Sequence, residues 1–128
     1  MRDARKILKE LKDLEKRRQE ILTGLLATDE LALGTLFCGK RPCGNPRCKQ
    51  CQEEGASHEQ VIFHYTNEEG RRTSRFVRRM EEDRFKRASD RYKAFRAALR
   101  ELKHVESEFH RMCGAFMRAR ALDPISRD

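Results

Sequence analysis

The sequence predicts a mainly α-helical fold with a small β-hairpin. Two long antiparallel helices, over residues 2–27 and 80–119, are expected to form a coiled-coil-like helical hairpin. A zinc knuckle over 38–58 and a β-hairpin over 61–77 are expected to be inserted between these helices. Three observations support this fold: two heptad stripes of apolar residues, a cluster of four cysteines, and a stretch of alternating apolar residues.

The first predicted helix carries apolar residues at alternating steps of three and four, the spacing of a helix face that packs on another helix. Its stripe is Ala4, Ile7, Leu11, Leu14, Arg18, Ile21 and Leu25. Arg18 is the only charged member. A short helical turn is expected over 28–37, because Thr28 and Asp29 can cap a helix N-terminus and Gly34 can end the turn.

The second predicted helix has the same spacing and one acidic intruder, Glu106. Its stripe is Phe85, Ala88, Tyr92, Phe95, Leu99, Leu102, Glu106, Phe109, Cys113 and Phe116. Placing Arg18 opposite Glu106 brings apolar residues together along both stripes. A homodimer through the same stripes is the alternative, since two helices rarely close a core. The whole chain, 1–128, is expected to be one domain ending in a tail over 120–128.

Residues 61–77 are predicted to form two strands. Val61, Phe63 and Tyr65 alternate with other residues, so they share one face of a strand. Gly70 suits the left-handed position of the turn that follows. Because a lone two-stranded hairpin is marginal in water, it is expected to lean on the preceding cysteine segment.

Four of the five cysteines fall within fourteen residues, in the order Cys38-x4-Cys43-x4-Cys48-x2-Cys51. Four thiolates can complete the tetrahedral coordination of Zn²⁺, and the intervening Gly and Pro residues allow a short chain to wrap around one ion. The sequence therefore predicts zinc held by these four cysteines, with His58 as an alternative ligand in place of Cys38. Disulfides and free thiols are the remaining alternatives, and a reducing compartment disfavours disulfides.

Composition favours a nucleic-acid partner, either DNA or RNA. The 128 residues are 39% charged and carry a net charge of +8, and a basic chain of this size typically binds a polyanion. The charged N-terminal segment is unlike a signal peptide, and no apolar run approaches the roughly 20 residues of a membrane helix. A cytoplasmic protein without membrane contact is therefore expected.

The basic excess is concentrated in residues 71–103, where thirteen Lys and Arg face five Asp and Glu. Most of the thirteen are arginines, whose guanidinium binds phosphate with two N–H groups, whereas lysine offers a point charge. The predicted nucleic-acid-binding residues are Arg71, Arg72, Arg75, Arg78, Arg79, Arg84, Arg87 and Arg91. The alternative is a solvated charged helix, or arginines paired with acids of the first helix.

No paired carboxylates, Ser/His/Asp set or phosphate-binding loop stands out, so neither an enzyme nor a catalytic residue is predicted. The favoured function is a zinc-stabilised, basic, nucleic-acid-binding accessory protein that acts by neutralising phosphates. The alternative is an adaptor or inhibitor that docks on a larger, nucleic-acid-processing enzyme through its helices and knuckle. Competition by bulk nucleic acid distinguishes the two.

The stretch "CGNPRCKQC…GASH…VIFHYTNEEGRRTSRFV" and the helix after it resemble a family of small, uncharacterised prokaryotic Cys-rich proteins. That family has the pattern CGKPxCRC, then HG, then an aromatic strand, and its members are often encoded beside transposases and other mobile elements. The resemblance covers residues 34–103 and implies Cys43, Cys48, Cys51 and His58 as metal ligands. The added Cys38, and "HEQ" in place of "HGP", depart from the pattern. The resemblance implies a link to a mobile-element or phage system and no reaction.

Overall fold

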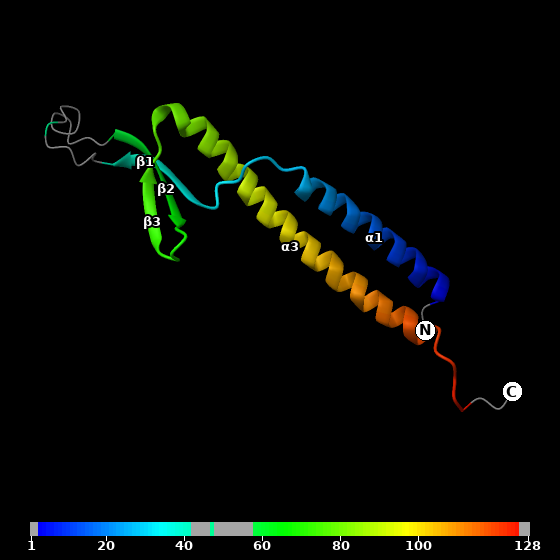
Figure 1. The fold of residues 1–128 in the computed structure, drawn as a ribbon. Helices are drawn as coiled ribbons and strands as arrows, with labels where there is room; N and C mark the ends of the chain where they lie inside the picture. The colour runs from blue at the N-terminus through cyan, green and yellow to red at the C-terminus, as the bar shows by residue number, and fades with distance from the viewer. Residues whose placement is uncertain (1–2, 42–46, 48–57, 126–128) are drawn as a thin grey trace. The chain divides into compact units, whose positions relative to one another are not determined.

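The computed structural model describes residues 3–41, 47 and 58–125. In chain order these form helix α1 (Ala4–Leu26), strands β1 (Gly34–Arg41), β2 (His58–Thr66) and β3 (Arg72–Phe76), the 3-10 turn η1 (Arg79–Glu81) and helix α3 (Glu82–Ala119) (Figure 1). The chain divides into two compact units, one of residues 1–28 with 95–128 and one of residues 29–94. Helix α3 contributes its C-terminal part to the first unit and its N-terminal part to the second.

The three strands form one antiparallel sheet in the order β1-β2-β3. β1 pairs with β2 along its whole length and ends with Arg41 opposite His58. β3 pairs with the other edge of β2, where Arg72 lies opposite Thr66. The predicted fold of two long helices with a two-stranded hairpin and a zinc knuckle between them is therefore wrong. The hairpin is part of a three-stranded sheet, and no metal knuckle is present among the residues that the structure describes.

β1 occupies residues that were predicted to be a helical turn over 28–37 and the start of the cysteine segment. Two glycines weaken the strand pattern there, since glycine is depleted in strands. The structure shows why Gly34 is present. A Cβ at this position would lie 2.2 Å from the carbonyl oxygen of His64 and 2.8 Å from the ring of Phe63. Gly34 thus weakens the strand pattern in the sequence, and it also lets β1 approach β2 closely.

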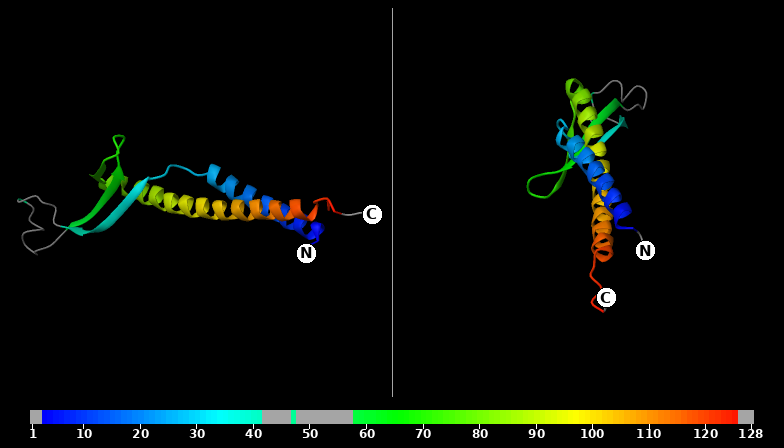
Figure 2. Two further views of the ribbon diagram at one scale, coloured as in Figure 1. Left: turned by 90° about the horizontal axis from the view of Figure 1, so that it is seen from below. Right: turned by 90° about the vertical axis from the view of Figure 1, so that its right-hand side faces the viewer.

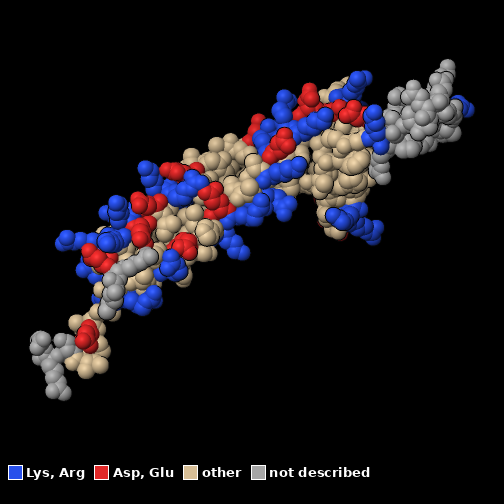
Figure 3. Space-filling model, turned by 180° about the vertical axis from the view of Figure 1, so that it is seen from behind, with Lys and Arg blue, Asp and Glu red and all other residues tan. Residues whose placement is uncertain are grey.

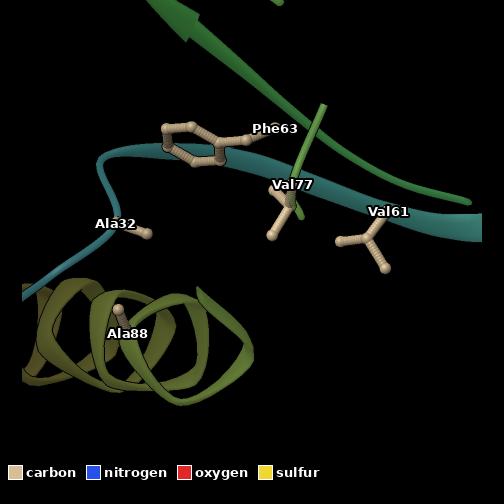
Figure 4. Packing of buried hydrophobic residues seen from close by; sticks show 5 residues of the cluster. All are labelled: Ala32, Val61, Phe63, Val77 and Ala88. Atoms are coloured by element: carbon tan, nitrogen blue, oxygen red, sulfur yellow. The ribbon is translucent and has the colours of Figure 1, made fainter. Parts of the chain in front are cut away.

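The sheet unit has its own hydrophobic core. Val61 and Phe63 of β2 pack with Val77 and with Ala88 of α3, and Ala32 lies over Ala88 (Figure 4). The ring of Phe85, which is half-buried, adds to this cluster with its centroid 5.4 Å from that of Phe63. The N-terminal part of α3 therefore covers one face of the sheet.

The helical unit consists of α1 lying antiparallel to the C-terminal part of α3 (Figure 2). The side chain of Asp3 caps α1 by accepting a hydrogen bond from the backbone N–H of Arg5 at 3.1 Å. Arg17 forms an ion pair with Glu101 across the two helices. The core of this unit contains Ile21, Leu25 and Val105, with Leu14, Phe95, Ala98 and Leu102 packed against it. None of the described helices is long and apolar enough to cross a membrane.

The buried stripe of α3 differs from the predicted one in its C-terminal half. Val105 and Met112 are buried, whereas Glu106 and Cys113 are exposed and Leu99 is 45% exposed. Both stripes have steps of three and four, because 3.6 residues per turn lets neighbouring positions fit the same pattern. The observed stripe is favoured because it replaces a carboxylate and a thiol with apolar side chains at the helix contact.

Arg18 finds its main partner on its own helix and not on α3. Its Nε and Nη2 atoms donate to the carboxylate of Glu15 at 2.9 and 3.0 Å. This contact is the main reason that the pKa of Glu15 falls to about 2, with a smaller effect from Gln19. Glu106 makes only the smallest contribution to raising the pKa of Arg18. The predicted pairing of Arg18 with Glu106 is therefore replaced by a pair between Arg18 and Glu15, one helical turn apart.

We expect Gly34→Ala to destabilise the sheet. The new methyl group would meet a backbone oxygen that cannot move without disturbing the β1–β2 ladder. Overpacking of this kind costs about 1–3 kcal/mol in the free energy of unfolding. Urea unfolding followed by circular dichroism measures that loss, and amide exchange in β1 locates it.

Gly24→Ala in α1 is the matched control, because nothing lies within 4 Å of a Cβ built there. Alanine should stabilise this helix by up to about 1 kcal/mol. Equal effects of the two substitutions would contradict the close approach of the strands at Gly34.

Candidate nucleic-acid interface

A tight turn between β2 and β3 positions the first two predicted arginines. The side-chain oxygen of Asn67 accepts hydrogen bonds from the backbone N–H groups of Glu69 and Arg71 at 3.0 and 2.9 Å. Gly70 has a φ of +81°, the left-handed conformation predicted for it. Arg71 and Arg72 follow directly and are both exposed. The turn therefore presents two guanidinium groups at one end of the sheet.

Arg75 is used to join β3 to the start of α3. Its Nη2 atom donates to both carboxylate oxygens of Glu81 at 2.8 and 2.9 Å. The guanidinium also lies over the ring of Phe85, with 5.3 Å between Cζ and the ring centroid. The hydrogen bond from Arg75 is the main cause of the lowered pKa of Glu81. Arg75 thus has two intramolecular partners at the edge of the core.

Arg84 and Arg91 hold the extended segment 29–33 against α3. Arg84 donates to both carboxylate oxygens of Glu30 at 2.6 and 2.8 Å, and Arg91 donates to the backbone oxygen of Glu30 at 2.8 Å. The N–H of Ala32 donates to the carbonyl of Ala88 at 3.1 Å. We call these contacts the Glu30 clamp. Arg84 is the main cause of the lowered pKa of Glu30.

The structure divides the eight predicted arginines into two groups. Three have the intramolecular partners given above. The other five are exposed, and within the described parts of the chain their guanidinium groups have no hydrogen-bond or ion-pair partner: Arg71, Arg72, Arg78, Arg79 and Arg87. We call these five the free arginines. No local pattern distinguishes the groups, because the acid that pairs with Arg84 is 54 residues away in the sequence.

On at least one face of the molecule, basic side chains are mixed with acidic ones. On the face that Figure 3 shows, Lys and Arg stand among Asp and Glu along the helices. Opposite charges so close together reduce the field that a distant phosphate experiences. The positions of the free arginines therefore say more about where a phosphate can bind than the total charge does.

The predicted metal ligands are placed only in part. Cys38 lies on β1 opposite Val61 and is exposed, and His58 is the first residue of β2. Cys43, Cys48 and Cys51 lie outside the described residues. Across residues 3–41, 47 and 58–125, no group of three or more His, Cys, Asp or Glu side chains is arranged to hold a metal ion. The zinc site stays a prediction from the sequence.

A polar hollow that no sequence pattern predicted lies at the end of the sheet where β2 leads into the turn. Its lining includes Thr35, His64, Arg72, Ser74 and Tyr92. All three strands and, through Tyr92, helix α3 contribute to this lining, and Thr35 is part of it because β1 joins the sheet. The hydroxyl, imidazole and guanidinium groups there are hydrogen-bonding groups suited to a phosphate or sugar.

The chain belongs to the family described as a domain of unknown function, DUF6788, whose model matches residues 11–87, more than half of the sequence. The match spans most of α1, the whole sheet and the start of α3. It includes all of the free arginines and the Glu30 clamp as far as Arg84. No curated protein and no solved structure matches the chain.

We expect Glu30→Gln to release the segment 29–33 from α3. The neutral amide loses the charge-assisted pair with Arg84, so the amide of Ala32 should exchange faster with solvent. Because the pKa of Glu30 is lowered, the wild-type clamp is complete above the ordinary carboxyl pKa and is lost as pH falls through the lowered value. The protection factor of Ala32 should fall over that range in the wild type and stay low in the variant.

Glu68→Gln in the exposed β2–β3 turn removes the same charge outside the clamp and serves as the control. Loss of Ala32 protection in this variant as well would mean that net charge, and not the clamp, sets the behaviour of the segment.

Proposed function

We propose that this member of the DUF6788 family is a non-enzymatic nucleic-acid-binding accessory protein that binds phosphates through the five free arginines. The observation that supports it is their exposure without a hydrogen bond or ion pair to a carboxylate among the described residues, although the charges of Arg78 and Arg87 contribute to the lowered pKa values of Glu81 and Glu30. An arginine already paired with a carboxylate must give up that contact before it binds phosphate. A free arginine binds at no such cost, and its fork matches two phosphate oxygens.

Four of the five free arginines flank β3, and the fifth, Arg87, lies on α3. Arg71 and Arg72 stand at its start, and Arg78 and Arg79 follow its last residue, Phe76. Arg78 lies six positions after Arg72 along the chain, a span of about 20 Å when the backbone is extended. Two such pairs suit phosphates several nucleotides apart on one strand, because a strand of duplex DNA carries one phosphate per roughly 3.4 Å of axis. The sheet sets the spacing and the arginines supply the affinity.

The proposal includes one zinc ion held by Cys43, Cys48 and Cys51, with Cys38 or His58 as the fourth ligand. Its support is the spacing of the thiols and their chemistry, since soft thiolates in a reducing cytoplasm are suited to Zn²⁺. The β1–β2 ladder pairs Arg41 with His58, the residues on either side of the segment that carries these three cysteines. Bound zinc would supply structural stability and no reaction.

The link to a mobile-element or phage system belongs to the same proposal and rests on the resemblance over residues 34–103. The rival function, an adaptor or inhibitor for a larger nucleic-acid-processing enzyme, predicts that the free arginines meet an acidic protein surface. Bulk nucleic acid would then fail to compete for binding, which distinguishes the two functions directly.

We expect Arg78→Ala combined with Arg79→Ala to weaken binding to a short DNA duplex and to flatten its salt dependence. Loss of two phosphate contacts should make the slope of log Kobs against log salt shallower by about 1.8. Fluorescence anisotropy of a labelled duplex at several salt concentrations measures both quantities.

The control removes two charges from α1 through Lys12→Ala combined with Lys16→Ala, both at exposed positions. An equal change of slope in this control would place the phosphate contacts elsewhere. Absence of nucleic-acid binding by the wild type at low salt would overturn the proposed function.

We expect native mass spectrometry of the purified protein to show one zinc per chain, and Cys48→Ser to abolish it because the site loses a thiolate. Comparing Cys38→Ser with His58→Ala then identifies the fourth ligand, since only one of the two should lower zinc content. Zinc-free protein whose mass shows paired cysteines would contradict the metal site.

A further inference from the structure

The sheet has a second face, opposite the one that α3 covers. Side chains of directly paired residues in an antiparallel sheet point to the same side, and neighbours along a strand alternate. Val61 and Phe63 point toward the core, so the alternate residues of β2, together with the residues of β1 and β3 paired with them, point the other way. We call this the open face; its described residues are Thr35, Phe37, Gly39, Gln60, Ile62, His64, Thr66, Arg72, Ser74 and Phe76.

An apolar row crosses the open face. Phe37 of β1 and Phe76 of β3 lie on either side of Ile62 of β2. Ile62 is 7% exposed, whereas Phe37 is 39% and Phe76 61% exposed. The ring of Phe37 packs against Gly39, where a Cβ would come within 2.7 Å of it. Two phenyl rings therefore stand about 10 Å apart, two strand spacings, on a face that the core does not need.

The surroundings of this row are basic and polar. None of the described residues of the open face is acidic. Arg72 lies on the same face, and Arg78 follows Phe76 by two residues with an extended backbone at φ −67° and ψ 150°. The polar hollow, with Thr35, His64 and Ser74, adjoins the row. Aromatic rings, guanidinium groups and hydroxyl groups thus occupy one surface.

We infer that the open face binds single-stranded nucleic acid, with a base stacked on Phe76 and phosphates bound by Arg72 and Arg78. This inference rests on the proposed function and specifies its ligand. Bases of a duplex are stacked on one another, so their faces cannot reach a ring on a sheet. A single strand presents free base faces, and stacking on aromatic side chains of a sheet is a general way to bind it.

The composition of the face favours a nucleotide over an apolar protein surface. A second copy of the chain or another protein would cover Phe37, Ile62 and Phe76 but would leave the cationic and hydroxyl-bearing side chains beside them without partners. A nucleotide matches both parts, because it joins an apolar base face to a sugar and an anionic phosphate. The sheet is also rigid, which reduces the entropy lost when a strand binds.

The test uses the full chain with substitutions at Phe76 alone. The probes are a fluorescein-labelled single strand of mixed sequence, as DNA and as RNA, and the matching DNA duplex. Wild-type protein should bind the single strands more tightly than the duplex. Phe76→Ala should weaken single-strand binding roughly 5- to 100-fold. Phe76→Leu should weaken it similarly, since leucine keeps an apolar side chain but has no aromatic face.

Phe76→Trp keeps the aromatic face and should retain or tighten binding. The natural chain has no tryptophan, so emission from this variant reports on position 76 alone. Stacking of a base should quench it on addition of an unlabelled single strand. Met117→Ala is the control for loss of an exposed apolar side chain, because Met117 is 67% exposed and lies far along α3.

The outcomes separate this inference from the proposed function. Equal single-strand binding by wild type and Phe76→Ala, or an unquenched tryptophan, overturns the inference and leaves phosphate binding by the free arginines in place. A dimer that Phe76→Ala dissociates without a change in binding assigns the open face to a second copy and also overturns it. No binding to any probe overturns both. A preference for RNA or for DNA, lost in Phe76→Ala, supports the inference and identifies the sugar.

Discussion

The pairing of β1 with β2 is the contact on which the sheet unit depends. It makes β2 a central strand, with its backbone groups bonded on both sides, and so allows Val61, Ile62 and Phe63 to be buried in succession. A two-stranded hairpin would leave one edge of β2 unpaired and would be marginal in water. The pairing needs Gly34, because any side chain there would meet the carbonyl of His64. The absence of a Cβ at position 34 therefore allows the close approach of β1 to β2.

The pairing of β1 with β2 also creates the two faces of the three-stranded sheet. One face binds α3 through Phe63 and the cluster around Ala88. The other carries Phe76, which is 61% exposed and belongs to neither hydrophobic core. Contiguous exposed apolar groups rimmed by polar residues typically mark an interaction site. The structural role of the sheet and its proposed binding role thus belong to opposite faces and do not compete.

Arginine serves two purposes in this chain. Arg75 and Arg84 each make two hydrogen bonds to a carboxylate. Arg75 thereby joins β3 to the start of α3, and Arg84 of α3 holds Glu30 of the segment 29–33. Exposed pairs of this kind add little stability individually, but their bidentate geometry fixes orientation. The free arginines make no such contact among the described residues. A high content of arginine is therefore not by itself a measure of the surface available to phosphate.

Features that depend only on neighbours along the chain could be predicted from the sequence. The three buried residues of α1, Ile7, Ile21 and Leu25, all belong to its predicted stripe, because helical periodicity is a local property. The left-handed Gly70 was also predicted, since the turn needs a residue without a Cβ penalty. The concentration of basic residues after the turn was equally visible in the sequence.

Features that depend on residues distant in the sequence arise from tertiary packing and could not be predicted from local patterns. β1 was not predicted because its glycines weaken the strand pattern, and it is stabilised by pairing with β2, a strand that begins 17 positions after β1 ends. The predicted buried stripe of α3 contained Glu106, whereas the observed stripe contains Val105. Two neighbouring faces of the helix have the same periodicity, and packing against α1 determines which one is buried. Glu30 pairs with Arg84, which is 54 residues away in the sequence, and no spacing rule predicts this contact. Local patterns set which elements can form, and long-range packing selects among them.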